Sequence, residues 1–220
     1  MRARLTRSAF LGAAGGALLL GAATPAPAAG PPRKIMLIRH ADKPSDEAGG
    51  IDSGGEASSK SLQVVGWERA GALVHFFASP STPGIARPTA ILASGPSRMV
   101  AGKLKAKSAR PFETVAALAE MLGLIVNTSY ASGEETALLA TVLRMPGVVL
   151  VSWGHKHITP LAQAIPTTDP GAIPAAWPGA RFDMVYVFDL QPDGLHYAFS
   201  QVPELLLPGD SRDPFPPAGR

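Results

Sequence analysis

The chain has 220 residues, of which 46% are hydrophobic and 17% are charged. This length fits one domain with a sizeable core and is short for two. The chain has no cysteine, which excludes a disulfide framework, a thiolate zinc site and a cysteine nucleophile. Any chemistry must therefore use His, Asp, Glu, Ser, Lys or Arg.

The first 28 residues have the pattern of a secretory signal peptide. Arg2, Arg4 and Arg7 precede an uncharged apolar run over residues 9–23, and Ala26-Pro27-Ala28 supplies a small-x-small cleavage site. This run is shorter than the roughly 20 apolar residues that a membrane span needs, so cleavage is expected rather than a retained anchor. The pattern predicts an exported chain, periplasmic or secreted, whose single domain covers residues 29–220 without a stable membrane anchor.

The excess positive charge of the chain belongs to this leader. The whole chain has 20 Lys and Arg against 17 Asp and Glu, a net charge of +3. Three of the 20 basic residues and none of the acidic ones lie in residues 1–28, so 17 of each remain in the domain. A net positive charge is the usual sign of a nucleic-acid partner, and the domain without the leader has none. We therefore expect no nucleic-acid partner.

Hydrophobic patterns, with Pro and Gly at the expected ends, divide the domain into alternating strands and helices. In chain order they predict a strand over 34–38, a polar loop over 45–60, a helix over 62–78, a strand over 89–93, an irregular basic segment over 94–109, helices over 111–123 and 133–144, a strand over 148–151, a short helix that begins at Thr159-Pro160, and two strands over 182–190 and 195–200. The alternation predicts a three-layer α/β/α sandwich with a mainly parallel central sheet. The turn Pro192-Asp193-Gly194 adds an antiparallel C-terminal hairpin.

Histidines and arginines stand directly after two of these predicted strands. The first strand ends in Arg39-His40, and the strand over 148–151 is followed by His155 and His157. Because parallel strands end at the same edge of a sheet, we expect these side chains to meet there with Arg110, which stands just before a helix. Guanidinium forks hold phosphoryl oxygens, a neutral imidazole can attack phosphorus, and an imidazolium can stabilise the developing charge. The pattern predicts a site for phosphoryl chemistry.

In this order and spacing the motifs resemble the histidine phosphatase superfamily, also called phosphoglycerate mutase-like, over most of the domain. The matching pieces are residues 35–41 with Arg39-His40, Leu62 with Gly66, Arg69 and Ala70, Arg110 with Thr114, and residues 149–155 with His155. The resemblance implies that His40 becomes phosphorylated and that Arg39, Arg110 and His155 clamp the phosphoryl oxygens. It also implies that the chemistry needs no metal or other cofactor.

The sequence departs from the pattern of this superfamily at the second histidine. Members usually place that histidine directly after the strand, whereas Trp153-Gly154 intervenes here, so His155 and His157 compete for the role. We assign it to His155, which is nearer the strand end and resembles members with a Trp-x-His version of the motif. We expect His157 and Lys43 to contact the substrate.

The superfamily also often supplies an acid that protonates the leaving oxygen. Glu134 is our candidate, and Asp42 beside His40 is a rival. Glu135 has a structural explanation, because Ser132-Gly133-Glu134-Glu135 has the pattern of a helix capping box. An aryl phosphate with a good leaving group needs no such acid.

These residues together predict an exported, metal-independent phosphatase that hydrolyses a small phosphomonoester or another phosphorylated substrate through a phosphohistidine on His40. A mutase is disfavoured, because export removes the protein from glycolytic substrates. Two alternatives stay open: a metal-dependent hydrolase that uses the His155/His157 pair with Asp183 or Asp42, and a catalytically inactive protein that binds a phosphorylated ligand. No pattern indicates the identity of the substrate or the oligomeric state.

Overall fold

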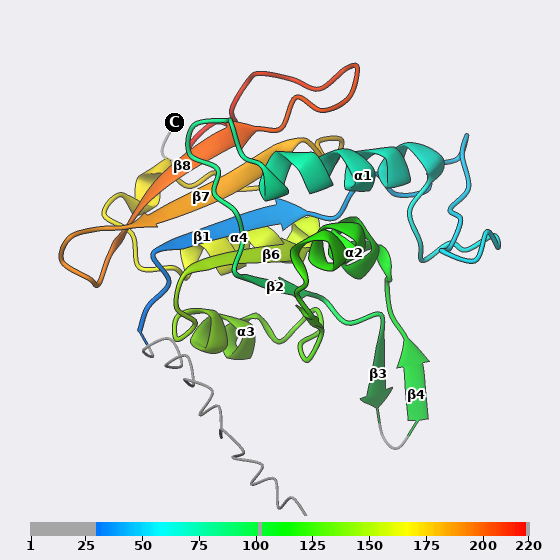
Figure 1. Cartoon of the computed structure of the whole chain (residues 1–220), viewed down its shortest axis with the longest axis horizontal. Helices are drawn as coiled ribbons and strands as arrows, with labels where there is room; N and C mark the ends of the chain where they lie inside the picture. The colour runs from blue at the N-terminus through cyan, green and yellow to red at the C-terminus, as the bar shows by residue number, and fades with distance from the viewer. Residues whose placement is uncertain (1–29, 101–102, 219–220) are drawn as a thin grey trace, which may run out of the picture.

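The computed structural model of the protein describes residues 30–100 and 103–218, so the predicted leader over residues 1–28 lies outside the described residues. Its elements, in chain order, are β1 (Lys34–Arg39), α1 (Val64–Ala78), β2 (Ala90–Ala93), β3 (Ser97–Val100), β4 (Lys103–Ala106), α2 (Arg110–Leu122), β5 (Val126–Asn127), α3 (Glu135–Val142), β6 (Val148–Trp153), α4 (His155–Gln163), the 3-10 turn Pro170–Ala172, β7 (Met184–Leu190) and β8 (Tyr197–Pro203) (Figure 1). Within the described part of the chain, no helix is long and apolar enough to cross a membrane.

Six strands form the main sheet, in the order β5-β2-β6-β1-β7-β8. The first four run parallel to one another, with pairs such as Ile35 with Val149 and Ala93 with Ser152. β7 pairs antiparallel with β1, and β8 pairs antiparallel with β7. The predicted mainly parallel sheet with an antiparallel C-terminal hairpin is confirmed.

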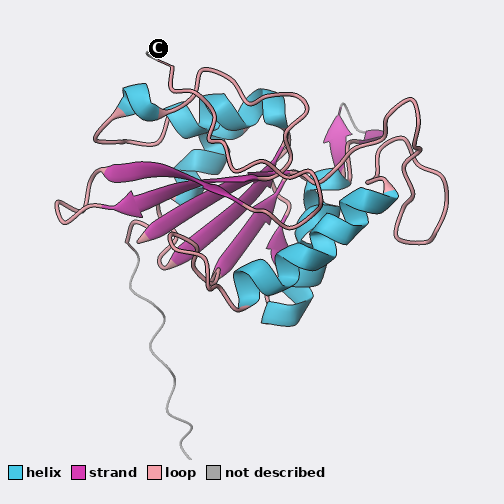
Figure 2. Cartoon of the chain, turned by 90° about the horizontal axis from the view of Figure 1, so that it is seen from above, coloured by secondary structure: helices cyan, strands magenta, loops and turns pink. Residues whose placement is uncertain are grey.

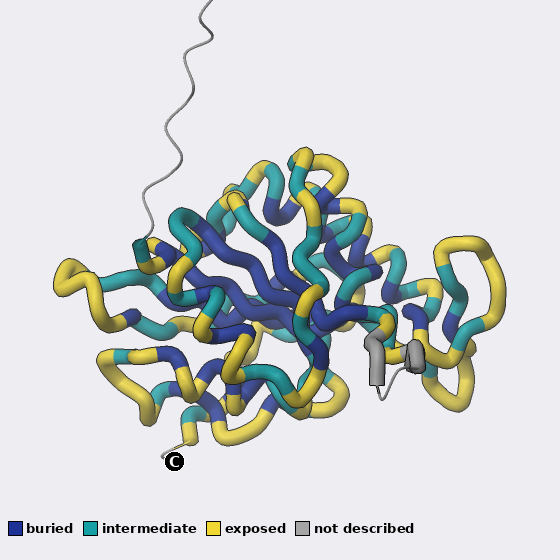
Figure 3. The backbone as a smooth tube through the Cα atoms, turned by 90° about the horizontal axis from the view of Figure 1, so that it is seen from below, coloured by how far each residue is buried: buried dark blue, intermediate teal, exposed yellow. Residues whose placement is uncertain are grey.

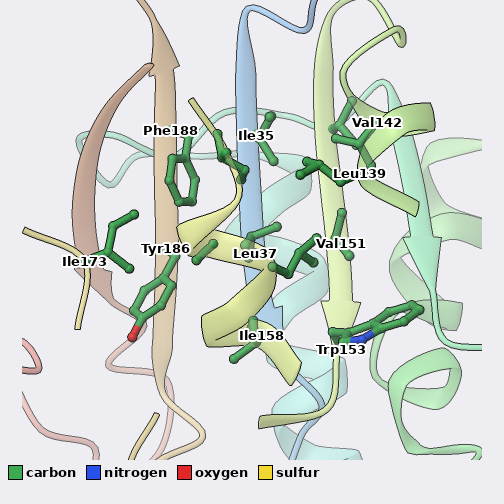
Figure 4. Packing of buried hydrophobic residues seen from close by; sticks show 14 of the residues in the cluster. Ile35, Leu37, Leu139, Val142, Val151, Trp153, Ile158, Ile173, Tyr186 and Phe188 are labelled. Carbon is green, nitrogen blue, oxygen red and sulfur yellow. The ribbon is translucent and has the colours of Figure 1, made fainter. Parts of the chain in front are cut away.

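The sheet lies between two layers of helices (Figure 2). Successive residues of β1 point to opposite faces, as the period of a strand requires. Ile35 and Leu37 pack into the cluster that also holds residues of α3 and α4 (Figure 4), whereas Met36 and Ile38 pack into the cluster that holds residues of α1 and α2. The central strands are buried between these layers (Figure 3). The predicted three-layer architecture is confirmed.

Several element boundaries differ from the sequence prediction. The segment predicted as irregular over 94–109 contains the β3–β4 hairpin, a separate two-stranded sheet that projects from the body beside α2 (Figure 1). The fourth helix begins at His155 and not at Thr159-Pro160, because Gly154 is extended and its carbonyl accepts the N–H groups of His157 and Ile158. The helix therefore starts directly after β6.

Candidate active site

The carboxyl ends of three parallel strands meet at one edge of the sheet. β1 is followed by His40, β2 by Ser94, and β6 by Gly154-His155. A cavity of about 350 Å³ opens at this edge. Its described lining residues are His40, Lys43, Ser94, Lys107, Ser108, Arg110, Pro111, Ser132, Gly154, His155, Lys156 and His157. The structure thus brings His40, Arg110 and His155 together, where open α/β sheets bind ligands.

His40 is buried at the floor of this site and is held in one tautomer. Its Nδ1 lies 2.7 Å from the carbonyl oxygen of Ala41, and since a carbonyl can only accept, Nδ1 carries the hydrogen. The other ring nitrogen, Nε2, therefore keeps its lone pair when the ring is neutral. Burial, together with the charges of Arg39 and Arg110, lowers the pKa of His40 from 6.5 to about 3. At neutral pH His40 is an uncharged imidazole with a nucleophilic Nε2.

Arg39, the last residue of β1, is almost completely buried and is held along one side of its guanidinium. Nη1 donates to the carbonyl oxygens of Pro178, Gly179 and Arg181 at 3.3, 2.9 and 2.7 Å, and the guanidinium carbon lies 3.7 Å above the centre of the Phe182 ring. Nε and Nη2 are buried without a hydrogen-bond partner among the described residues. Burial and the charge of Arg110 lower its pKa to about 10. Arg39 is not among the described residues that line the cavity, and its charge reaches the site by lowering, together with burial, the pKa of His40 and of His155.

Arg110 is the first residue of α2, where Pro111 occupies a favourable early helical position. Its Nη1 donates to the carbonyl oxygen of Ser59 at 3.1 Å, and its Nε is buried without a partner among the described residues. Burial lowers the pKa of this guanidinium as well. Arg110 therefore places a further positive charge at the cavity, at the N-terminus of a helix.

His155 is the first residue of α4 and is partly buried at the cavity wall. Burial, and then the charges of Arg39 and Lys156, lower the pKa of its imidazole. The cavity itself is strongly cationic, because its lining includes Arg110 and three lysines, Lys43, Lys107 and Lys156. Such a positive potential attracts anions.

His157 also lines the cavity, on the same turn of α4, and is paired with Glu135. The His157 Nδ1 lies 3.2 Å from Glu135 Oε1, and that oxygen also accepts the indole N–H of Trp153 at 3.0 Å. Both carboxylate oxygens accept the N–H of Gly133. The capping box predicted from Ser132 to Glu135 is wrong: α3 begins at Glu135, and its carboxylate bonds to Gly133 and Trp153, which leaves Ser132 to line the cavity.

The two candidate acids lie outside the cavity lining. Glu134 Oε2 accepts the N–H of Ala131 at 2.9 Å, and Asp42 Oδ2 accepts Nε of Arg69 at 2.8 Å. Asp42 is also packed closely under α1, because a Cβ added to Gly66 would clash with the Asp42 carbonyl oxygen. Lys43, by contrast, lines the cavity as expected of a substrate contact.

The residues proposed for a metal site are dispersed. Asp42 is bound to Arg69, and Asp183 accepts Nε of Arg181 at 2.6 Å and the N–H of Ser211 at 2.7 Å. Among the described residues, no three His, Asp or Glu side chains come close enough to hold one ion. Neither carboxylate therefore completes the His155/His157 pair.

Some groups of the site have little or no signal in the sequence. The carbonyl groups that hold Arg39 come from the loop 178–181, where no periodic pattern marks them. Ser94 and Ser132 line the cavity from two other loops. Only Ser94 had a usable signal, because it directly follows an apolar strand, as His40 does.

No protein-family model matches the chain, and no curated protein matches it in sequence. Among solved structures, the chain is similar to a mycobacterial glucosyl-3-phosphoglycerate phosphatase, with 13% identity and a TM-score of 0.43 over 76% of this chain and 97% of that one. The same phosphatase in complex with VO3 gives 15% identity and a TM-score of 0.44 over 77% and 97%. A mycobacterial hydrolase gives 13% identity and a TM-score of 0.43 over 76% and 89%. What the site can do follows from its own side chains.

Proposed function

We propose that the protein is a histidine phosphatase that hydrolyses phosphomonoesters through a phosphohistidine on His40. The observation that carries this proposal is the state of His40: a neutral ring, fixed by Ala41, with Nε2 free to attack. The buried Arg39 and the cavity-lining Arg110 supply positive charge for a phosphoryl group, and the imidazole of His155 lines the same cavity as a further hydrogen-bonding group.

The first step is in-line attack. His40 Nε2 forms a bond to phosphorus while the bond to the leaving oxygen breaks, and the electron pair leaves with that oxygen, which then takes a proton. Arg39, Arg110 and His155 stabilise the charge on the phosphoryl oxygens as the transition state forms. In the second step water attacks phosphorus and gives up a proton to the surrounding solvent, and the electron pair of the broken P–N bond returns to Nε2.

The proposal extends to substrate and location. A small phosphorylated molecule fits a cavity of about 350 Å³ that is lined by lysine, arginine and histidine. The pattern of residues 1–28 supports export to the periplasm or the exterior, where a phosphatase that needs no metal works independently of metal supply.

Turnover of p-nitrophenyl phosphate by the wild-type protein and the His40→Ala variant tests this mechanism. We expect the wild-type protein to release phosphate, to resist EDTA, to be inhibited by vanadate, and to yield an acid-labile phosphoryl-protein on rapid quenching. His40→Ala should show neither turnover nor label. His196→Gln is the matched control, because its imidazole is paired with Asp193 in the β7–β8 turn, at the opposite edge of the sheet.

Three other outcomes would count against the proposal. An active His40→Ala protein would overturn the phosphohistidine. Activity lost on EDTA treatment and restored by a divalent cation would support the metal-dependent hydrolase. Binding of inorganic phosphate without turnover of any ester in a panel of phosphomonoesters would support the inactive binding protein.

A further inference from the structure

The described lining of the cavity has no carboxylic acid that could give a proton to a leaving group. Its described lining contains histidines, lysines, one arginine and small residues, but neither Asp nor Glu. The two acids nearest in sequence to the motifs, Glu134 and Asp42, accept hydrogen bonds from Ala131 and Arg69 outside that lining. An alkoxide leaving group nevertheless needs a proton, because it is a strong base.

His157 lines the cavity and lies next to the carboxylate of Glu135. Nδ1 of His157 lies 3.2 Å from Oε1 of Glu135, within ion-pair distance of this carboxylate. This leaves Nε2, at the opposite corner of the ring, as the atom available to the cavity that His157 lines. The side chain of His157 is 42% exposed, which leaves it accessible to solvent protons.

Glu135 is itself held in place from two sides. It accepts the indole N–H of Trp153, which is completely buried at the end of β6, and the backbone N–H of Gly133. These bonds connect the start of α3 to the strand that carries His155. The carboxylate is therefore a fixed support for the imidazole of His157 rather than a mobile surface group.

We propose that His157 is the general acid of the reaction and that Glu135 is its positioning residue. The inference rests on the proposed function. As the P–O bond breaks, the proton on Nε2 of an imidazolium His157 passes to the leaving oxygen, and His157 becomes neutral. Glu135, 3.2 Å from Nδ1, orients the ring before the transfer. In the second step the attacking water gives up one proton and His157 regains one, so the atoms and charges balance with water as the only other reactant.

The test compares a poor and a good leaving group in the same variant. For His157→Gln we expect kcat/KM with glycerol 2-phosphate, which loses an alkoxide, to fall by about 10²- to 10⁴-fold. With p-nitrophenyl phosphate, whose leaving group needs no proton, kcat/KM should change little. The ratio of the two values on one preparation is independent of the folded fraction, so even a poorly folding variant decides the question.

Glu135→Gln provides the second variant, because the amide retains an acceptor oxygen for Trp153 and Gly133 but loses the charge. We expect the same selective loss with glycerol 2-phosphate, smaller than that of His157→Gln. His196→Gln, which disrupts an exposed histidine–carboxylate pair far from the cavity, should leave both substrates unaffected.

Equal losses on both esters, or no loss on glycerol 2-phosphate, would overturn the role of His157. In either case His40-dependent turnover of p-nitrophenyl phosphate by the wild-type protein would leave the proposed function intact. A wild-type protein that turns over neither ester would overturn the proposed function and this inference together.

Discussion

The hydroxyl of Thr114 accepts the backbone N–H of Ala41 at 2.8 Å and donates to the carbonyl oxygen of Arg110 at 2.7 Å. The buried side chain of Thr114 therefore connects Ala41, the residue after His40, to the backbone of Arg110. Ala41 is also the residue whose carbonyl orients the His40 ring. Thr114 thus sets the position of α2 relative to the proposed nucleophile, which explains the Arg-x-x-x-Thr spacing in structural terms.

Thr114→Val should remove this connection while it preserves the shape of the side chain. The buried N–H of Ala41 would lose its acceptor, so we expect the free energy of unfolding to fall by about 1–3 kcal/mol. We also expect kcat/KM for p-nitrophenyl phosphate to fall. Urea denaturation and steady-state kinetics check both. Thr114→Ser keeps the hydroxyl, so its stability and kcat/KM should stay near the wild-type values. Wild-type values for Thr114→Val as well would show that the hydrogen bond to Ala41 contributes to neither.

Arg110→Ala should lower kcat/KM for p-nitrophenyl phosphate by about two to three orders of magnitude, as expected for the loss of one preorganised charged donor. The kcat/KM of Arg110→Lys should lie between those of the wild type and Arg110→Ala, because an ammonium group keeps the charge but lacks the planar fork of a guanidinium. Arg144→Ala is the control, since Arg144 is exposed between α3 and β6, at the opposite end of the sheet. Equal activity of the alanine variant and the wild type would remove Arg110 from the mechanism.

The depressed pKa of His40 should make the protein less stable in mild acid. Burial, with the charges of Arg39 and Arg110, lowers this pKa from 6.5 to about 3. Between these values the unfolded chain binds a proton that the folded chain does not, so the free energy of unfolding falls as the pH falls. The slope from this group is up to about 1.4 kcal/mol per pH unit.

His40→Asn removes that titration, so its free energy of unfolding should fall less steeply between pH 6.5 and about 4 than that of the wild type. Urea denaturation at several pH values measures the difference, and His196→Gln should follow the wild-type slope. Parallel slopes for His40→Asn and the wild type would show that the imidazole is not held neutral by its surroundings.

The sequence predicted the parts of this site that depend on strand ends, and missed those that depend on where a helix begins. Apolar runs placed His40 and His155 at one edge, because parallel strands share a direction. The sequence did not predict the pairing of His157 with Glu135. Thr159-Pro160 has the residues of a helix start, so the predicted helix began after His155 and His157. In the structure Gly154 is extended and the helix begins directly after it, at His155. Nothing in the neighbouring sequence marks this conformation of Gly154.

Arg69→Met tests a buried ion cluster that supports the loop after β1. The guanidinium of Arg69 bonds to Asp42 at 2.8 Å and to both oxygens of Asp210 at 2.8 and 3.0 Å, and lies 3.4 Å from Glu204. Asp210 in turn accepts the N–H groups of Leu206 and Leu207. The cluster thus joins α1, the loop after His40 and the C-terminal segment.

Methionine at position 69 would leave these carboxylates buried without their cation, so we expect a loss of about 3–5 kcal/mol in the free energy of unfolding. Glu204→Gln is the informative comparison. Burial, opposed by Arg69, raises the pKa of Glu204 well above its usual range, so a neutral amide imitates its protonated form and should cost less. Urea denaturation of both variants at neutral pH measures the two losses. A loss below about 1 kcal/mol for Arg69→Met would mean that the ion cluster does not hold the loop.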